Sequence, residues 1–189
     1  MNDIFEITII GRGGQGSKTT SEVIASTALR FGKYMQAFSE YGAERSWAPI
    51  NSYVRIADKP ISIHSTIVDP DLTVIMDDSL IEMAACNRPD SMLIVNTTKT
   101  PHQIRELLGL KTGRVFTVNS TGISIEVIGK NIPNTPTAGA ISKVAGEHIV
   151  KKEQLEKELR DKLEKKIGRE MMDKNIVCLN RGYDEVKEG

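Results

Sequence analysis

Hydrophobic positions in the first part of the chain alternate between short β-branched runs and a segment with a helical period. Residues 4–10, IFEITII, are apolar and rich in isoleucine, a pattern that predicts a buried strand. From Ser17 apolar positions recur at helical spacing until Gly32, which predicts a helix that ends at this glycine. Residues 34–38, YMQAF, predict a second strand. This βαβ opening favours a parallel pair of strands joined by a right-handed crossover.

The pattern then departs from that of an all-parallel sheet. Residues 50–67 hold two alternating runs on either side of ADKP, which is typical of a β-hairpin. Further buried strands are predicted at residues 71–77, 91–96 and 114–119, with helical segments between and after them. We therefore predict a three-layer α/β/α fold with a mixed, mostly parallel sheet and a Rossmann-like βαβ start.

Helical patterns dominate the rest of the chain. Residues 136–149 predict a helix rich in small residues, which suits close packing. Beyond residue 150 the sequence becomes highly charged, and apolar residues recur at every fourth position, at Leu155, Leu159, Leu163 and Ile167. This period predicts an amphipathic helix, and a final helix follows it. We expect an α/β core domain over residues 1–150 and a helical C-terminal extension over residues 151–189, packed on the core or on a partner.

The charge balance narrows the classes of partner. The 189 residues include 25 Lys and Arg against 25 Asp and Glu, so the formal net charge is zero. This balance argues against binding to nucleic acid or to an anionic membrane, and it favours association with other proteins. No apolar run approaches the length of a membrane span. Asp3 and Glu6 stand where a signal peptide would be basic, so we expect a cytoplasmic protein.

The residues that commonly carry chemistry are sparse. Cys86 and Cys178 are the only cysteines, and two thiols cannot supply the four thiolates of an iron–sulfur cluster or of a structural zinc site. We expect two buried free thiols and no metal bound by this chain. Asp77 and Asp78 fit the amino-terminal cap of the next helix better than a metal site. No arrangement of Ser, Cys and His suggests a nucleophile with its base, so no catalytic residue is predicted.

The first candidate site is the glycine-rich sequence GRGGQG. It consists of Gly11, Arg12, Gly13, Gly14, Gln15 and Gly16, between a predicted strand and a predicted helix. Glycines in this pattern allow a tight turn and a close approach of the backbone, and a helix amino terminus favours an anion. Three interpretations stay open: an NAD(P) site with Glu40 on the ribose, a site for another phosphate-bearing ligand, and close packing without a ligand. Ser17 excludes a P-loop, because that motif needs glycine there.

The second candidate lies within residues 37–56, AFSEYGAERSWAPINSYVRI. This segment places Glu44, Arg45 and Trp47 in a loop between two predicted strands. Loops at strand ends carry functional groups, and Arg and Trp are favoured at the energetic centres of interfaces. The alternative is an ordinary surface ion pair between Glu44 and Arg45, which contributes little energy.

Together the two motifs resemble those of the gamma subunit of 2-oxoacid:ferredoxin oxidoreductases, and most closely the pyruvate type. The likeness rests on GRGGQG opening a helix, on GKYMQAFSEYGAERSWAPINSYVRI, and on a PD dipeptide before a buried strand. It continues through NIPNTPTAGA and ends at KNIVCLNRGYDEV, so it covers essentially the whole chain. Ser46 and Trp47 replace smaller or basic residues that many members carry at these positions.

The resemblance implies a complex that converts a 2-oxoacid and coenzyme A to an acyl-CoA, CO2 and reduced ferredoxin. The implied partners are alpha, beta and delta-type subunits, with ferredoxin as the electron acceptor. Thiamine diphosphate, Mg²⁺ and 4Fe-4S clusters are implied to lie in those subunits, so this chain alone is expected to bind no cofactor and to have no catalysis of its own. Residues 11–16 and Arg45 are then expected at a subunit interface or on the coenzyme A side, where Arg12 and Arg45 would face an anion.

Two alternatives come from other classes of function. One is a stand-alone NAD(P)- or nucleotide-binding Rossmann-like module, and the other is a structural adaptor without a ligand. Within the leading hypothesis, the 2-oxoacid stays open among pyruvate, 2-oxoglutarate and branched-chain oxoacids. The direction of the reaction and the subunit stoichiometry are also left open by the sequence.

Overall fold

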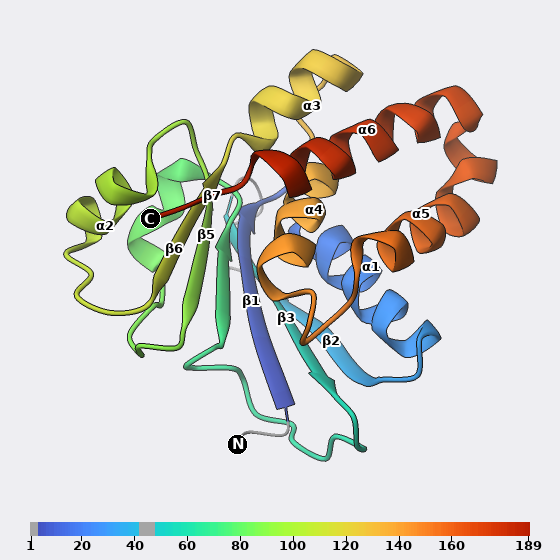
Figure 1. The fold of residues 1–189 in the computed structure, drawn as a ribbon. Coiled ribbons are helices and arrows are strands. Elements are labelled where there is room, and N and C mark those ends of the chain that lie inside the picture. Colours follow the sequence, from blue (N-terminus) through green and yellow to red (C-terminus); the bar gives the residue numbers. More distant parts are fainter. Residues whose placement is uncertain (1–3, 42–47) are drawn as a thin grey trace.

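The computed structural model describes residues 4–41 and 48–189, in which a seven-stranded mixed sheet lies between two layers of helices (Figure 1). The elements, in chain order, are β1 (Ile4–Arg12), α1 (Ser17–Arg30), β2 (Tyr34–Tyr41), β3 (Pro49–Ala57), β4 (Leu72–Ile75), the 3₁₀ helix η1 (Asp78–Met83), β5 (Met92–Asn96), α2 (Pro101–Leu108), β6 (Arg114–Val118), α3 (Ser120–Ile128), α4 (Asn134–Ala145), α5 (Lys152–Ile167), α6 (Arg169–Glu185) and β7 (Lys187–Glu188). These elements confirm the predicted fold class.

The sheet has the strand order β2-β3-β1-β4-β5-β6-β7. Strands β1, β4, β5 and β6 pair in parallel, whereas β3 is antiparallel to both β1 and β2, and β7 is antiparallel to β6. Strand β2 therefore runs in the same direction as β1, as the βαβ opening predicts. The two strands are not neighbours, however, because β3 occupies the position between them.

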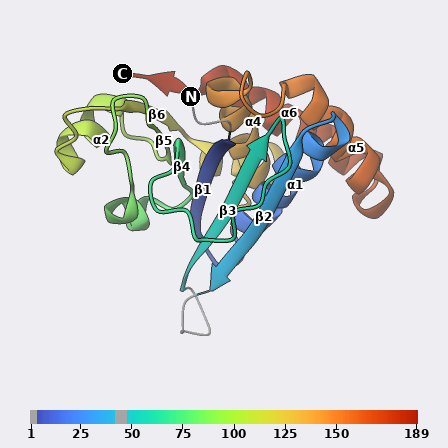
Figure 2. The same ribbon diagram turned by 90° about the horizontal axis from the view of Figure 1, so that it is seen from below.

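The predicted hairpin around ADKP is wrong. Strand β3 is the first of the two runs, but the second run, in residues 61–67, forms no strand. Both edges of β3 are already paired, with β1 on one side and β2 on the other, so no backbone groups are left for a third partner. The segment between β3 and β4 instead crosses the face of the sheet over β2 and β3 (Figure 2). There the side-chain amide of Gln36 donates to the carbonyl of Ile61.

Apolar side chains on the two faces of the sheet form two separate core clusters. The larger lies under α1, α4, α5 and α6 and includes Ile7, Ile9, Val74 and Ile94 from the strands. The smaller lies under η1 and α2 and includes Ile10, Ile75, Leu93 and Val95. Successive strand residues contribute to opposite clusters because side chains alternate across a strand. The result is the predicted three-layer arrangement.

The small residues of α4 allow its backbone to touch α6. A Cβ atom at Gly139 would collide with the carbonyl of Leu179, and one at Gly182 would collide with the carbonyl of Pro136. This contact confirms the close packing predicted for residues 136–149. Residues 151–189 add Leu155, Leu159, Met172 and Leu179 to the larger core cluster. The division into a 1–150 core and a 151–189 extension stays a prediction.

Candidate functional site

The glycine-rich sequence forms a tight turn at the carboxyl end of β1. The amide of Gln15 donates to the carbonyl of Arg12 at 3.2 Å, and the amide of Arg12 donates to Gln15 Oε1 at 2.8 Å. Gly14 and Gly16 have φ values of 88° and 86°, in the left-handed region that favours glycine. The backbone conformation at positions 14 and 16 therefore requires the glycines of the motif.

Part of the close approach predicted for this turn occurs within the chain. A Cβ atom at Gly16 would lie 2.9 Å from the Cβ of Asn134, at the start of α4. At Gly11 a Cβ atom would lie 3.3 Å from the Cβ of Met76. Gly13 is different, because a Cβ atom there would meet no atom within 4 Å and the residue is exposed. The outward part of the turn, Gly13 and Gly14, is thus the part open to a ligand or a partner.

Side chains from the loop after β4 fix the two polar residues of the turn. Gln15 Nε2 donates to Asp77 Oδ2 at 2.5 Å. The Arg12 guanidinium donates to Ser79 Oγ at 2.8 and 3.1 Å, and its Nε lies 3.8 Å from Asp77 Oδ2. Asp77 and Ser79 were not predicted as site residues. The sequence did offer a signal, because DDS directly follows an apolar strand and so lies at the same sheet edge as GRGGQG.

Asp77 is the electrostatic centre of this arrangement. It caps η1, since its carboxylate accepts from both the amide and the hydroxyl of Ser79. This cap confirms the predicted role of the aspartate. Burial opposes ionisation of the Asp77 carboxyl, but the hydrogen bonds from Ser79 and Gln15 and the charge of Arg12 outweigh it, so its pKa lies below the ordinary value. Asp77 thus balances much of the positive charge of Arg12.

Polar residues continue along the carboxyl edge of the parallel strands. Lys99, after β5, contacts Asp78 Oδ2 with its Nζ at 2.5 Å, and the Thr97 hydroxyl donates to the same oxygen at 3.1 Å. The Asn96 side chain donates to the carbonyl of Met76 and to Thr121 Oγ1. Ligands of open α/β sheets bind at this edge, where the strands end and the backbone leaves the sheet. The carboxyl edge is therefore the candidate functional site.

The geometry disfavours a dinucleotide site of the standard kind. In that site the acidic residue that binds the ribose ends the strand next to the glycine-rich strand. Here β3 separates β2 from β1, so Glu40 lies one strand, about 5 Å, further away. Glu40 also accepts hydrogen bonds from the Tyr53 hydroxyl at 3.0 Å and the Thr66 hydroxyl at 3.1 Å. These bonds hold the carboxylate to its own sheet and crossing segment.

Arg45 and its neighbours Glu44 and Trp47, predicted as a second candidate, lie outside the described residues. Among the described residues that follow them, Pro49 stands opposite Arg12 in the β1–β3 ladder. The predicted combination of Arg12 and Arg45 at one site stays a prediction.

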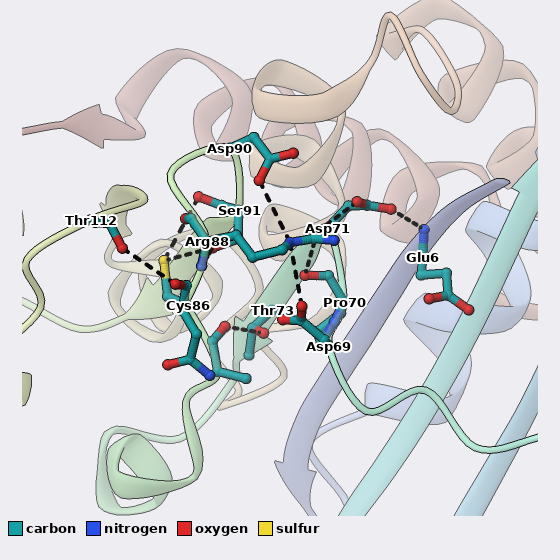
Figure 3. Close-up of polar contacts among 12 residues, drawn as sticks. Glu6, Asp69, Pro70, Asp71, Thr73, Cys86, Arg88, Asp90, Ser91 and Thr112 are labelled. Carbon is teal, nitrogen blue, oxygen red and sulfur yellow. Dashed lines mark hydrogen bonds and ion pairs between the residues drawn. The ribbon is translucent and has the colours of Figure 1, made fainter. Parts of the chain in front are cut away.

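A second polar cluster lies at the opposite edge of the sheet (Figure 3). Arg88 donates to Asp71 Oδ1 at 2.7 Å, and its Nε lies 3.5 Å from both Asp69 and Asp90. The other carboxylate oxygen of Asp71 accepts the backbone amide of Glu6 at 2.8 Å. The arginine thus ties the loop before β5 to the start of β4 and, through Asp71, to β1. We assign this cluster a structural role.

The cysteines are buried and free, as predicted. Burial raises the pKa of the Cys178 thiol to about 11, so this sulfur is a packed side chain and not a reactive thiolate. Among the residues that the structure describes, no three His, Cys, Asp or Glu side chains are grouped as they would be to hold a metal ion. None of the helices in residues 4–41 and 48–189 has the length and hydropathy of a membrane span.

Fold and site together define an α/β domain whose candidate site lies at the carboxyl edge of its parallel strands, next to a glycine-rich turn. The family model for pyruvate ferredoxin/flavodoxin oxidoreductase matches residues 6–185. The chain therefore belongs to this family, and the resemblance seen in its motifs is confirmed.

Full-length relatives include subunits of oxidoreductases. Pyruvate synthase subunit PorC of Thermotoga maritima is 42% identical over 97% of this chain and 95% of its own length. The common gamma subunit of the pyruvate and ketoisovalerate oxidoreductases of Thermococcus kodakarensis is 38% identical over 96% of this chain and 97% of its own. These two relatives support the gamma-type identity and lend no support to a stand-alone NAD(P)-binding module.

Solved structures show the same fold. The crystal structure of pyruvate oxidoreductase subunit PORC from Thermotoga maritima superimposes with a TM-score of 0.85 and 36% identity, and the match covers 100% of this chain and 99% of that one. A 2-oxoglutarate:ferredoxin oxidoreductase from Magnetococcus marinus matches with a TM-score of 0.78. At 18% identity that second match shows the fold alone, and it covers 97% of this chain but 31% of the larger one.

Proposed function

We propose that this chain is the gamma-type subunit of a cytoplasmic pyruvate:ferredoxin oxidoreductase and assembles with alpha, beta and delta-type subunits. The complex oxidatively decarboxylates a 2-oxoacid with coenzyme A to an acyl-CoA and CO2, and it reduces ferredoxin. Thiamine diphosphate, Mg²⁺ and the iron–sulfur clusters belong to the other subunits in this proposal. The observation that carries it is the full-length match, at 42% identity, to a pyruvate synthase subunit.

We assign the contacts of this chain within the complex to the carboxyl edge of its sheet. Gly13 and Gly14 are exposed at the tip of the turn, with open space before them. Next to them in the chain, the guanidinium of Arg12 is held in a defined position by its contacts with Ser79 and Asp77. We propose that this tip meets either a partner subunit or the coenzyme A side of the active site, together with Arg45.

The proposal leaves the choice of 2-oxoacid to other subunits. One relative is named as a gamma subunit common to pyruvate and ketoisovalerate oxidoreductases. A subunit common to two such complexes does not itself set the substrate. We therefore expect pyruvate as the first substrate to test, with branched-chain oxoacids and 2-oxoglutarate beside it.

The first experiment is an anaerobic affinity purification of the tagged chain from its native cell. The proposal predicts co-purifying subunits with iron–sulfur absorption, and 2-oxoacid- and coenzyme A-dependent reduction of viologen. The preferred oxoacid in this assay identifies the substrate. A colourless chain that purifies without partners would contradict the proposal.

The second experiment separates a ligand role of the turn from an assembly role. Replacing Arg12 and Arg45 by Gln should raise the apparent KM for coenzyme A several-fold with kcat little changed, if the turn faces the coenzyme. The matched control is Asp77→Asn, which removes the carboxylate that orients Arg12 and Gln15 but keeps both positive charges. Loss of co-purifying subunits, with an unchanged KM in the complex that remains, would assign the turn to assembly alone.

A further inference from the structure

A separate pocket lies at the edge of the sheet opposite the glycine-rich turn. It has a volume of about 480 Å³, which lies within the range of small-molecule sites. It opens between the first residues of β5 and β6, the end of α4, the start of α5 and the end of α6. The lining residues that matter are Arg114, Lys143, Lys151, Lys152, Glu153 and Tyr183.

Two ammonium groups in this pocket approach the same aromatic ring. Lys143 Nζ lies 4.8 Å from the centroid of the Tyr183 ring, and Lys152 Nζ lies 4.7 Å from it. Lys151 lines the pocket beside them. The face of the Tyr183 ring attracts each ammonium group, so two positive charges are held on one side chain of the pocket.

None of these lysines forms an ion pair with a carboxylate in the described part of the chain. Glu147 and Glu153 also line the pocket, but neither lies within 4.0 Å of a lysine ammonium group. The fourth cation, Arg114, is already paired with Glu188 at 2.7 Å. Three lysines against these two glutamates leave the pocket with a small excess of positive charge.

The lysines also stand at an unfavourable place on α5. Lys151 is the N-cap residue of this helix and Lys152 is its first residue. The amino end of a helix carries a partial positive charge, so basic residues there destabilise the helix and anions stabilise it. Glu153 is the acidic residue in the first turn of this helix. An anion in the pocket would add to it in stabilising the helix end, and it would reduce the repulsion among the lysines.

We propose that this pocket binds a small polyphosphate anion, either free pyrophosphate or the diphosphate group of a nucleotide. Lysine binds phosphate well as a point charge, and three separate ammonium groups suit an anion with charges on two linked phosphates. The pocket shares no residue with the turn at residues 11–16. This inference goes beyond the proposed function, and neither depends on the other.

The test is calorimetric titration of the full-length chain with inorganic pyrophosphate and, separately, with ADP. The proposal predicts saturable binding of at least one of them at a single site, weakened by added salt. Lys143→Gln with Lys152→Gln should weaken that binding about tenfold or more, because two charged donors are lost. Tighter binding of ADP would identify a nucleotide, and tighter binding of pyrophosphate a free polyphosphate.

The matched control is Lys157→Gln with Lys166→Gln, which removes the same charge from two exposed positions further along α5. It should change the affinity by less than about twofold, since screening reduces the effect of distant surface charges. Circular dichroism verifies that both double variants keep their helices. Absence of saturable binding, equal weakening in the control, or binding of a glutamate-rich peptide but neither phosphate compound would overturn the proposal.

Discussion

At the residue scale, the most unusual feature is the fully buried arginine in the middle of β3. The side chain of Arg55 is 1% exposed and donates to Glu6 Oε1 at 2.7 Å and to the carbonyl of Ser65 at 2.7 Å. Its guanidinium also lies 5.8 Å from the centre of the Phe38 ring. Arg55 thus joins β1, β2 and the segment that crosses the sheet. The alternation of residues along β3 identifies the face of the sheet on which Arg55 lies. Only the folded structure shows which groups Arg55 contacts there.

Arg55→Met should lower the free energy of unfolding by about 3 kcal/mol. The substitution leaves the Glu6 carboxylate partly buried without its partner, and it frees the crossing segment. Glu6→Gln in the same background should recover part of the loss, because it removes the uncompensated charge. Urea denaturation measures all three proteins. A loss below about 1 kcal/mol in the single variant would show that water solvates this ion pair.

The Asp77 carboxyl should make stability depend on acid pH. Its pKa is lowered in the folded protein, so its contribution is fully present above the unfolded value of about 3.9 and is lost as pH falls through the folded pKa. Asp77→Asn should cost about 1–2 kcal/mol at neutral pH and should flatten the fall of stability below about pH 4. Ser79→Ala should act in the same direction but less strongly, since the Ser79 amide still donates to Asp77. An acid-unfolding profile unchanged by Asp77→Asn would contradict this assignment.

At the element scale, the contact between α4 and α6 decides how the C-terminal helices sit on the core. Glycines at Gly139 and Gly182 bring the two backbones together, as the collisions at their Cβ positions show. In an isolated helix alanine is more favourable than glycine by about 1 kcal/mol. The contact between these helices reverses that preference.

Gly182→Ala should therefore destabilise the protein by about 2 kcal/mol or more. The added methyl group collides with the Pro136 carbonyl, and a backbone group in a packed helix cannot move aside cheaply. Gly13→Ala is the matched control, because its new Cβ would meet no atom within 4 Å. Thermal unfolding compares the two. Stabilisation by Gly182→Ala would mean that α4 and α6 lie further apart than this structure shows.

At the scale of the whole molecule, the sheet and all four large helices on one face share a single core cluster. Leu155, Met172 and Leu179 are fully buried, and Leu159 is buried with them. The last residues return to the sheet, since β7 pairs with β6 at its edge. Residues 151–189 thus bury apolar surface together with the strands and with α1 and α4.

Deletion of residues 151–189 should abolish cooperative folding of the remainder. Each buried Leu or Met contributes about 2 kcal/mol, and the loss of several exceeds the margin by which a domain of this size is stable. The intact chain should unfold in one transition by circular dichroism and by differential scanning calorimetry. A truncated chain that unfolds cooperatively would establish residues 1–150 as an independent domain.

Local sequence determined the elements of this protein and much of its identity. The helical periods, the apolar runs and the glycines at positions 14, 16 and 32 act within a few residues, so the pattern alone predicts α1, β1 and the turn between them. The two motifs together were specific enough to identify the family. The small residues of α4 likewise predicted a close contact with another element.

Only the tertiary structure decided which elements are neighbours. The insertion of β3 between β1 and β2 moved Glu40 away from the glycine-rich turn, and it left residues 61–67 without a strand to pair with. Asp77 and Ser79 joined Arg12 because parallel strands far apart in sequence end at one edge. The lysines around Tyr183 met because three helices, α4, α5 and α6, converge there. Strand order and such long-range contacts are set by the packing of the whole chain, which no local pattern encodes.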